Sequence, residues 1–338
     1  MIHKKQKLSS CQTVQIYRFR EFLPDIDRIL FFDIETTGLG RRNSSLYLIG
    51  CINREEQTWY RQQWFAETPA EEKTILCQFI QTAQNYSCFL HFNGCSFDVP
   101  YLQYKCTHYK LENIFSDKKQ IDLYQIFSPL RPLLPVPSFK QKDLEVYLQT
   151  ERRDPYTGKD LITLYKKYVA SPTPQILETL LLHNLEDIHG LLSLLSFYAM
   201  LDLLQGNISQ CEASLIPSAA EENTKELLIR AVTRYPFPVQ FSLRQDREYL
   251  TWNEDRLSLK VSLKDGYLRF YYPNYKDYYY LPEEDYAVHK SLGTYVDKAH
   301  RINATKDTCY QPVPWNESLF QETESCTQYV SYFLQHLQ

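Results

Sequence analysis

The chain has 338 residues, of which 43% are hydrophobic and 23% are charged, and its net charge is −4. This length allows one large domain or two, and the composition is that of an ordinary globular protein. The longest apolar runs, such as Leu191–Leu195, are broken by polar residues before the roughly 20 residues that a membrane-spanning helix requires. The basic start of the chain has no apolar segment typical of a signal peptide. We therefore expect a cytoplasmic protein that does not enter a membrane.

The cysteines and the charges exclude fewer classes of protein than the length and composition do. The nine cysteines are scattered, without the C-x2-C spacing of a zinc site, and we interpret them as small buried apolar residues. The first 205 residues carry equal numbers of basic and acidic side chains, so the acidic excess lies in the remainder. If the acidic residues of the candidate site below are set aside, the first part has a basic excess, which is compatible with a polyanionic partner.

The first part of the chain shows strands followed by helices, a pattern typical of an α/β domain. Ile29–Phe32 is an apolar run of strand formers that continues to Thr36, before the breaker Thr37-Gly38. Four prolines indicate a loop at 128–140. The other expected strands are Leu46–Ile52, Gln57–Phe65, Cys88–Phe92 and Gln120–Tyr124, and the expected helices are Pro69–Gln84, Phe97–Lys105, 141–149, 159–169 and 174–204.

A breaker segment from Gln205 to Pro217 precedes a second region of a different kind. A helix is expected around Glu283–Ala299, and another near the end of the chain. We therefore predict a domain of residues 25–205, followed by a smaller, strand-rich α+β domain of residues 206–338. Its expected strands, with a turn at Lys264-Asp265-Gly266, are Val239–Leu243, Tyr249–Trp252, Leu257–Leu263, Tyr267–Tyr272 and Tyr278–Leu281.

Two carboxylates lie at the end of the first buried strand, Asp33 and Glu35. Side chains at i and i+2 of a strand point to the same face, so these two emerge side by side. Such carboxylates repel one another unless a cation neutralises them, and Mg2+ or Mn2+ suits oxygen ligands of this kind. Taken alone, the pair also fits a solvated strand end.

Two later segments carry further candidates. Asp98 follows the breaker Asn93-Gly94 and lies in the first turn of a helix, where the helix dipole favours a carboxylate. His183 and Asp187 are four residues apart in a long helix and share one face. An imidazole beside a metal-bound carboxylate can take a proton from an attacking water. Alternatively, Asp98 is a structural acid at a helix start and His183 is a structural core histidine.

Together these segments resemble the three exonuclease motifs of the DEDD superfamily. The matching residues are Asp33-Ile-Glu35-Thr-Thr-Gly-Leu39, Phe92-Asn-Gly-x3-Asp98 and His183-Asn-x2-Asp187. The resemblance extends over about residues 25–205 and is closest to the bacterial YprB-type ribonuclease H-like proteins, which share pieces such as Ile121-Asp122-Leu123 and the Asp160–Tyr168 stretch. It implies a ribonuclease H-like mixed sheet flanked by helices and a metal-dependent nuclease, namely a 3′→5′ exonuclease acting on single-stranded DNA or RNA.

The same resemblance assigns roles to individual residues. It implies that two Mg2+ or Mn2+ ions are bound by Asp33, Glu35, Asp98 and Asp187, and that His183 is the general base. Substrate contacts are implied for Thr36, Thr37, Gly38, Leu39, Asn93 and Phe97, of which the first four form the turn against the terminal nucleotide. One departure concerns His183, which stands four residues before the last aspartate, as tyrosines do in tyrosine-type members; histidine-type members place the histidine five residues before it.

Two alternative functions stay open: a non-cleaving nucleic-acid-binding or scaffolding protein, and a structure-specific endonuclease with the same metal site. The tyrosines of Tyr267–Tyr280 can stack on unpaired bases, or simply suit strands. His289 and His300 lack metal-ligand spacing, and the sequence leaves protein partners unknown. The basic side chains that can contact phosphates, or lie on solvated helix faces, are Lys140, Lys142, Arg152, Arg153, Lys166 and Lys167.

Overall fold

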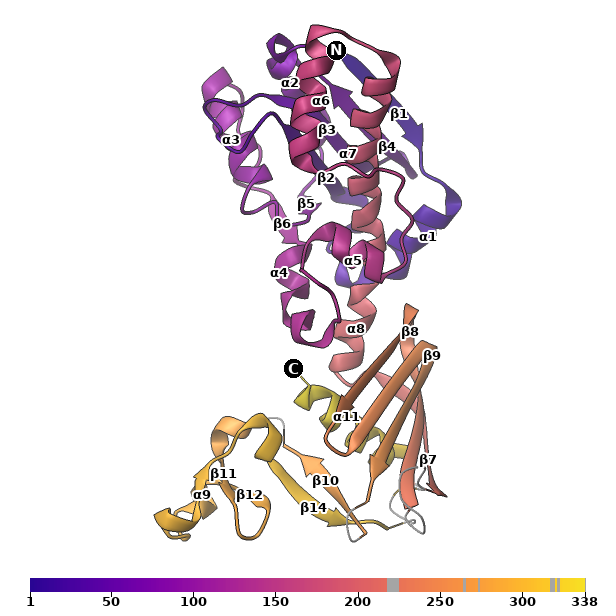
Figure 1. Ribbon diagram of the computed structural model, residues 1–338, viewed down its shortest axis with the longest axis vertical. Helices are drawn as coiled ribbons and strands as arrows, with labels where there is room; N and C mark the ends of the chain where they lie inside the picture. The colour runs from indigo at the N-terminus through magenta and orange to yellow at the C-terminus, as the bar shows by residue number, and fades with distance from the viewer. Residues whose placement is uncertain (218–224, 264–265, 273, 317–319, 321–322, 338) are drawn as a thin grey trace. The chain divides into compact units, whose positions relative to one another are not determined.

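The computed structural model describes residues 1–217, 225–263, 266–272, 274–316, 320 and 323–337. The chain forms two compact units, residues 1–196 and 197–338, and each is described by itself. The first unit is the α/β part and runs from indigo to magenta in Figure 1. The second unit is rich in strands.

The first unit is built on a mixed six-stranded sheet with the order β1-β4-β3-β2-β5-β6. Strands β2, β3 and β4 form an antiparallel meander, and β5 and β6 run parallel to β2. Strand β1 was not predicted, because its sequence is mostly polar; it pairs with β4 at the sheet edge. The bounds are β1 Ile2–Lys7, β2 Ile29–Thr36, β3 Leu46–Glu55, β4 Thr58–Phe65, β5 Cys88–His91 and β6 Lys119–Asp122.

Helices cover both faces of this sheet (Figure 1). On one face, α2 and α3 pack on Leu30, Phe32 and Ile34 of β2. On the other face, α6 and α7 pack on Tyr47, Leu48 and Phe65. Since strand side chains alternate, Asp33 and Glu35 lie on the side opposite to Ile34. The helices are α1 Ser10–Arg18, α2 Glu72–Ala83, α3 Asp98–Tyr109, α4 Leu123–Phe127, α5 Gln141–Tyr147, α6 Gly158–Ala170 and α7 Pro174–Leu194, and the 3-10 helices are Arg20–Phe22, Ile26–Arg28, Pro69–Glu71 and Ser128–Leu133.

The long helix predicted over 174–204 is two helices in the structure. Helix α7 ends at Leu194, and α8 runs over Phe197–Leu204. The segment Pro174–Leu204 is long and apolar enough to cross a membrane, although no such span was expected from the sequence. However, 78% of its most apolar part is buried in the protein. Buried core helices have the same length and apolar composition, so this segment is weak evidence for a membrane span.

In the second unit, three long strands form an antiparallel sheet in the order β7-β8-β9. The predicted breaker at Gln205–Pro217 is wrong beyond its first residues, because β7 occupies 208–217 and pairs with β8. The predicted piece Val239–Leu243 is the end of a strand of 21 residues. The strands are β7 Ile208–Pro217, β8 Lys225–Gln245, β9 Glu248–Ser262, β10 Tyr267–Tyr271, β11 Tyr278–Leu281, β12 Tyr286–His289, β13 Ile302–Asn303 and β14 Tyr310–Pro314.

Other local predictions also need correction. The proline-containing segment 128–140 begins with a 3-10 helix rather than a loop. Of the predicted helix around Glu283–Ala299, only Lys290–Gly293 is α-helical (α9), whereas Tyr286–His289 is strand β12 and Lys298–His300 is a 3-10 helix. The expected helix near the end of the chain is α11, Thr323–His336. Residues 264 and 265 of the predicted turn lie outside the described residues, and the remaining 3-10 helices are Tyr275–Asp277, Lys298–His300 and Lys306–Thr308.

Candidate active site

Three elements of the first unit carry the predicted acidic residues. Asp33 and Glu35 lie on β2, Asp98 is the first residue of α3, and Asp187 lies on α7. Because β2 and β5 are parallel, their carboxyl ends meet at one edge of the sheet, and the turn after β5 delivers Asp98 to this edge. Helix α7 packs against β2 and β3. The fold therefore gathers residues from positions 33 to 187 at one place.

These carboxylates strongly disfavour one another's ionisation. Burial, followed by the charges of Asp187, Glu35 and Asp98, raises the pKa of Asp33 well above its usual range. Burial and the charges of Asp187 and Asp98 do the same to the pKa of Glu35. Burial also raises the pKa of Asp98 to about 7, against hydrogen bonds from the main chain and with added repulsion from Asp122 and Asp187. A divalent cation would relieve this repulsion, so the donor set fits a hard metal ion.

His183 lies close to two of the acidic residues. Its Nε2 atom lies 3.5 Å from Oε1 of Glu35 and 3.3 Å from Oδ2 of Asp187. One ligand atom from each of these three residues lies within 4.8 Å of the other two, which is close enough for a shared metal ion. His183 is buried, as a structural histidine would be, but its ring faces the carboxylates. The spacing of four residues thus brings its imidazole to the acidic residues.

Asn184 holds Asp33 in place, a role that the sequence analysis did not assign. Its Nδ2 donates to Oδ2 of Asp33 over 3.0 Å, and its Oδ1 accepts from Nε2 of Gln63 over 2.9 Å. A Cβ atom at Gly50 would stand 2.1 Å from Oδ1 of Asn184, so the glycine leaves the space that this amide occupies. The signal in the sequence was its place beside His183, but its partners are far away along the chain.

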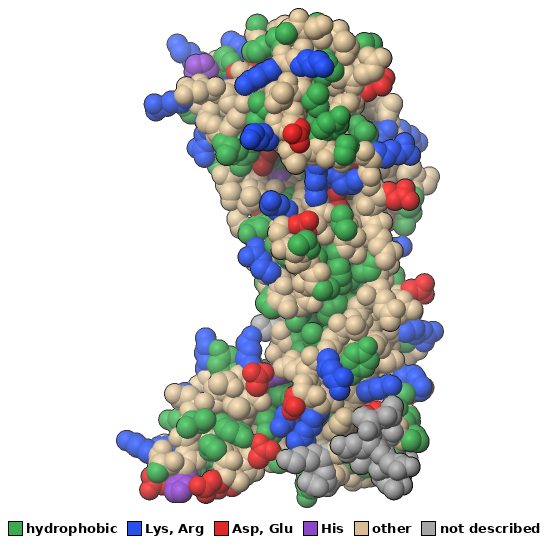
Figure 2. All heavy atoms as spheres, viewed as in Figure 1, with side chains coloured by type: hydrophobic (Ala, Val, Ile, Leu, Met, Phe, Trp, Pro, Cys, Tyr) green, Lys and Arg blue, Asp and Glu red, His purple; other side chains and the backbone are tan. Residues whose placement is uncertain are grey.

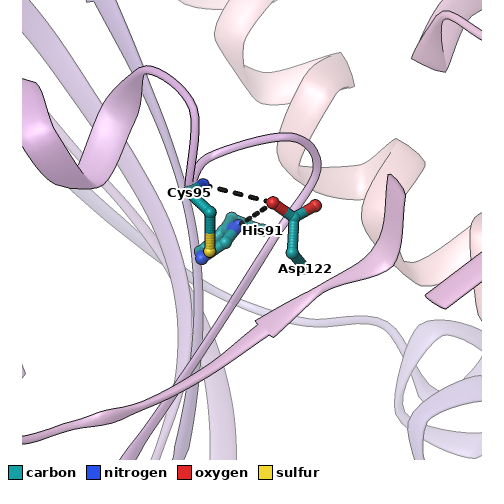
Figure 3. Close-up of side chains that lie close together, drawn as sticks. All are labelled: His91, Cys95 and Asp122. Atoms are coloured by element: carbon teal, nitrogen blue, oxygen red, sulfur yellow. Dashed lines mark hydrogen bonds and ion pairs between the residues drawn. The ribbon is translucent and has the colours of Figure 1, made fainter. Parts of the chain in front are cut away.

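The turn that carries Asp98 is fastened by Asp122, which lies at the end of β6. The carboxylate of Asp122 accepts from the main-chain N–H of Asn93 (2.7 Å) and of Cys95 (3.2 Å). Nδ1 of His91 accepts from the N–H of Gly94 (3.2 Å). Figure 3 shows His91, Cys95 and Asp122 close together. Their nitrogen, sulfur and oxygen atoms lie within 4.8 Å of one another, as in a metal site, but the oxygens of Asp122 and Nδ1 of His91 already accept main-chain N–H groups. This arrangement therefore fixes the turn before Asp98.

The residues expected to contact substrate lie in two turns, one at the end of β2 and one before α3. Thr36 donates from its hydroxyl to the carbonyl oxygen of Gly38, and the hydroxyl of Thr37 accepts from the N–H of Ser45, so the turn after β2 is ordered by its own threonines. Leu39 is 83% exposed at the tip of this turn. The remaining two lie in the turn before α3: Asn93, with a positive φ of 58°, and Phe97, whose ring packs near Tyr101.

Arg152 is a basic side chain that reaches the acidic group. Its Nη1 lies 2.7 Å from Oδ1 of Asp187 and 2.7 Å from Oε2 of the fully buried Glu145. The guanidinium is 10% exposed, and its Nε and Nη2 atoms have no hydrogen-bond partner among the described residues. Arg152 thus offsets negative charge at the site. Its neighbour Arg153 is exposed.

The other sequence candidates lie in different surroundings. Lys142 donates to Asp154 and to the carbonyl oxygen of Tyr156, whereas Lys140, Lys166 and Lys167 are exposed. On the visible face, Lys and Arg side chains are interspersed with acidic ones (Figure 2). Several tyrosines of 267–280 take part in packing: Tyr272 stacks on Tyr278 (4.6 Å between ring centroids), and Tyr271 is buried.

Comparisons with known proteins concern mainly the first unit. Residues 30–198, half of the chain, match the RNase_H_2 family model, described as RNase_H superfamily. No curated protein matches the chain. Among solved structures, the chain is similar to the family B DNA polymerase from the hyperthermophilic archaeon Pyrobaculum calidifontis, at 15% identity and a TM-score of 0.41 over 52% of this chain and 25% of the polymerase.

Two structures of exonuclease I are also similar. The apo form matches at 14% identity and a TM-score of 0.31 over 61% of this chain and 56% of the enzyme. The E. coli enzyme in complex with a dT13 oligonucleotide matches at 11% identity and a TM-score of 0.34 over 91% of this chain and 71% of the enzyme. The chain thus spans a quarter of the polymerase and just over half of apo exonuclease I.

Proposed function

Because the chain belongs to the RNase_H superfamily, we propose that it is a divalent-metal-dependent nuclease that hydrolyses phosphodiester bonds of single-stranded DNA or RNA. The observation that carries this proposal is the largely buried group of Asp33, Glu35, Asp98 and Asp187, of which the first three have a raised pKa because of burial and of the neighbouring negative charges. A group with this much mutual repulsion is expensive to keep unless it binds cations. The 3′→5′ polarity and the kinship with the YprB-type branch rest on the sequence resemblance.

In this proposal the four carboxylates hold two Mg2+ or Mn2+ ions, with Asn184 holding Asp33 and Arg152 offsetting charge on Asp187. The bound ions would lower the pKa of a water and stabilise the negative charge that develops at the phosphate. His183 would accept the proton of that water at Nε2, which faces Glu35 and Asp187. The turn 36–39 would contact the terminal nucleotide.

Cleavage of labelled strands tests this function. Purified protein is incubated with 5′- or 3′-labelled single-stranded DNA and RNA in Mg2+, Mn2+ or EDTA. We expect metal-dependent shortening from the 3′ end. D33N should lower the rate by more than about 100-fold, because outer-shell partners of metal ligands typically already account for 10- to 100-fold. E151Q changes an exposed acid and should leave the rate within about twofold.

The alternatives give different results. Internal cuts in structured substrates, abolished in D33N, would replace the exonuclease by an endonuclease on the same site. Retention of strands in a gel shift without any cleavage, equal for wild type and D33N, would replace the enzyme by a nucleic-acid-binding protein. The domain division at 205/206 and the cytoplasmic location stay predictions.

A further inference from the structure

A buried carboxylate lies behind the imidazole of His183, on the side away from the acidic group. Oδ2 of Asp154 is 2.5 Å from Nδ1 of His183, whereas Nε2 of the same ring faces Glu35 and Asp187. The side chain of Asp154 is 1% exposed and that of His183 is 5% exposed. The two residues are 29 positions apart, with Asp154 in the segment between α5 and α6 and His183 on α7, so only the fold brings them together.

Asp154 is held as an anion by several donors. Nζ of Lys142 lies 3.1 Å from Oδ2, and the main-chain N–H of Tyr156 donates to Oδ1 over 3.1 Å. Burial acts to raise the pKa of Asp154, but the hydrogen bond from Tyr156, the charge of His183 and the hydrogen bonds from Lys142 and His183 outweigh it, and the pKa is lowered. An ionised carboxylate only accepts hydrogen bonds, so Nδ1 of His183 must be the donor. Nε2 is then the ring nitrogen that faces the acidic group.

The segment that carries Asp154 is fastened to α7. Glu186 accepts from the N–H of Arg153 (2.9 Å) and from the N–H of Asp154 (3.1 Å). The neighbouring Arg152 contacts Asp187 on the same helix. Glu186 and Asp187 thus both hold the segment 152–154 against α7. This leaves little freedom for Asp154 to move away from His183.

From these contacts we infer that Asp154 is a positioning residue, which accepts a hydrogen bond from Nδ1–H of His183 and so directs Nε2 of the ring at the candidate metal site. The catalytic part of this inference rests on the proposed function. There a proton would pass from the attacking water to Nε2, and the resulting imidazolium would keep its Nδ1–H donated to Asp154. Such a carboxylate would account for a histidine that works from the tyrosine spacing, because the ring is oriented by a second residue as well as by its own helix.

The first test observes the tautomer in the metal-free protein and does not depend on activity. Long-range 1H–15N NMR of 15N-histidine-labelled protein, with H183Q to assign the signal, should show a proton on Nδ1 of His183. In D154N, whose amide both donates and accepts, a substantial share of the rings should lose the proton on Nδ1. E151Q, an exposed acid in the same segment, should match wild type. An unprotonated Nδ1 in wild type, or an Nδ1 that stays fully protonated in folded D154N, would overturn the inference. If D154N does not fold, the wild-type tautomer alone decides.

The second test is kinetic. D154N should lower kcat about 10- to 100-fold, the usual effect of losing an outer-shell partner, and leave KM within about threefold. Unchanged kcat together with a changed tautomer would overturn the catalytic part. If wild type cleaves no substrate while D154N changes the tautomer, the positioning contact stands and the proposed function fails. The two proposals can therefore fail separately.

Discussion

The side-chain amide of Asn184 donates a 3.0 Å hydrogen bond to a carboxylate oxygen of Asp33, across 151 residues of sequence. This bond joins α7 to β2 at the acidic site. It also orients the carboxylate of Asp33, which the negative charges of Asp187, Glu35 and Asp98 repel.

Replacing Asn184 by alanine removes the donor to Asp33 and the acceptor of Gln63. We expect metal-dependent cleavage to fall by about 10- to 100-fold. The free energy of unfolding should fall by about 1–3 kcal/mol, because buried polar groups lose a partner. Rates and urea denaturation would measure both effects. Q175A, on the exposed start of the same helix, is the matched control and should behave as wild type.

A methyl group added at Gly50 should crowd the side-chain amide of Asn184. G50A places a Cβ atom 2.1 Å from Oδ1 of Asn184, so the amide or the strand must shift, at a cost of about 1–3 kcal/mol. G40A meets no atom within 4 Å and should change stability by less than about 0.5 kcal/mol. Thermal unfolding of the two variants compares them directly. Equal melting temperatures would contradict the close packing.

Mn2+ should stabilise the wild-type protein, because it relieves repulsion between the acidic residues. At 100 times the dissociation constant the gain is about 2.7 kcal/mol. Calorimetry with Mn2+ and with EDTA would measure the shift in melting temperature. The double variant D33N/D187N should lose most of it. The same shift in both proteins would mean that the ion binds elsewhere.

Arg152 and Arg153 are neighbours with opposite surroundings. R152Q leaves Glu145 and Asp187 without their cation and should lower the free energy of unfolding of the metal-free protein by about 3–5 kcal/mol. R153Q changes an exposed side chain and should stay within about 0.5 kcal/mol of wild type. Urea denaturation of both variants is the measurement. A small effect of R152Q would show that the carboxylates find other partners.

Glu248 of the second unit predicts a pH dependence that is independent of the active site. Burial raises its pKa from 4.5 to about 7, against the attraction of Arg269 and Arg247. A carboxyl group with a raised pKa stabilises the fold fully below pH 4.5 and loses this contribution as the pH rises through 7. E248Q should therefore be more stable than wild type by up to about 3 kcal/mol at pH 8, and by less than about 1 kcal/mol at pH 5. A constant difference between pH 5 and pH 8 would disprove the shift.

The limits of sequence reasoning are clear in the secondary structure. Apolar runs predicted β2 to β5, because a buried strand must be apolar wherever it faces the core. Polar or mixed segments were missed or misassigned, such as β1 and β7, because pairing with a neighbouring strand stabilises them. The break between α7 and α8 was also missed, since apolar residues continue across it.

For the site, local periodicity alone determined that Asp33 and Glu35 share a strand face and that His183 and Asp187 share a helix face. A strand repeats every two residues and a helix about every 3.6, so such pairs need no tertiary information. Only the tertiary structure decided that Asp154 lies behind His183, that Asn184 reaches Asp33 and that Arg152 joins Glu145 to Asp187. These contacts depend on where separate elements meet, and their geometry is set by packing of the whole sheet and its helices rather than by any local pattern.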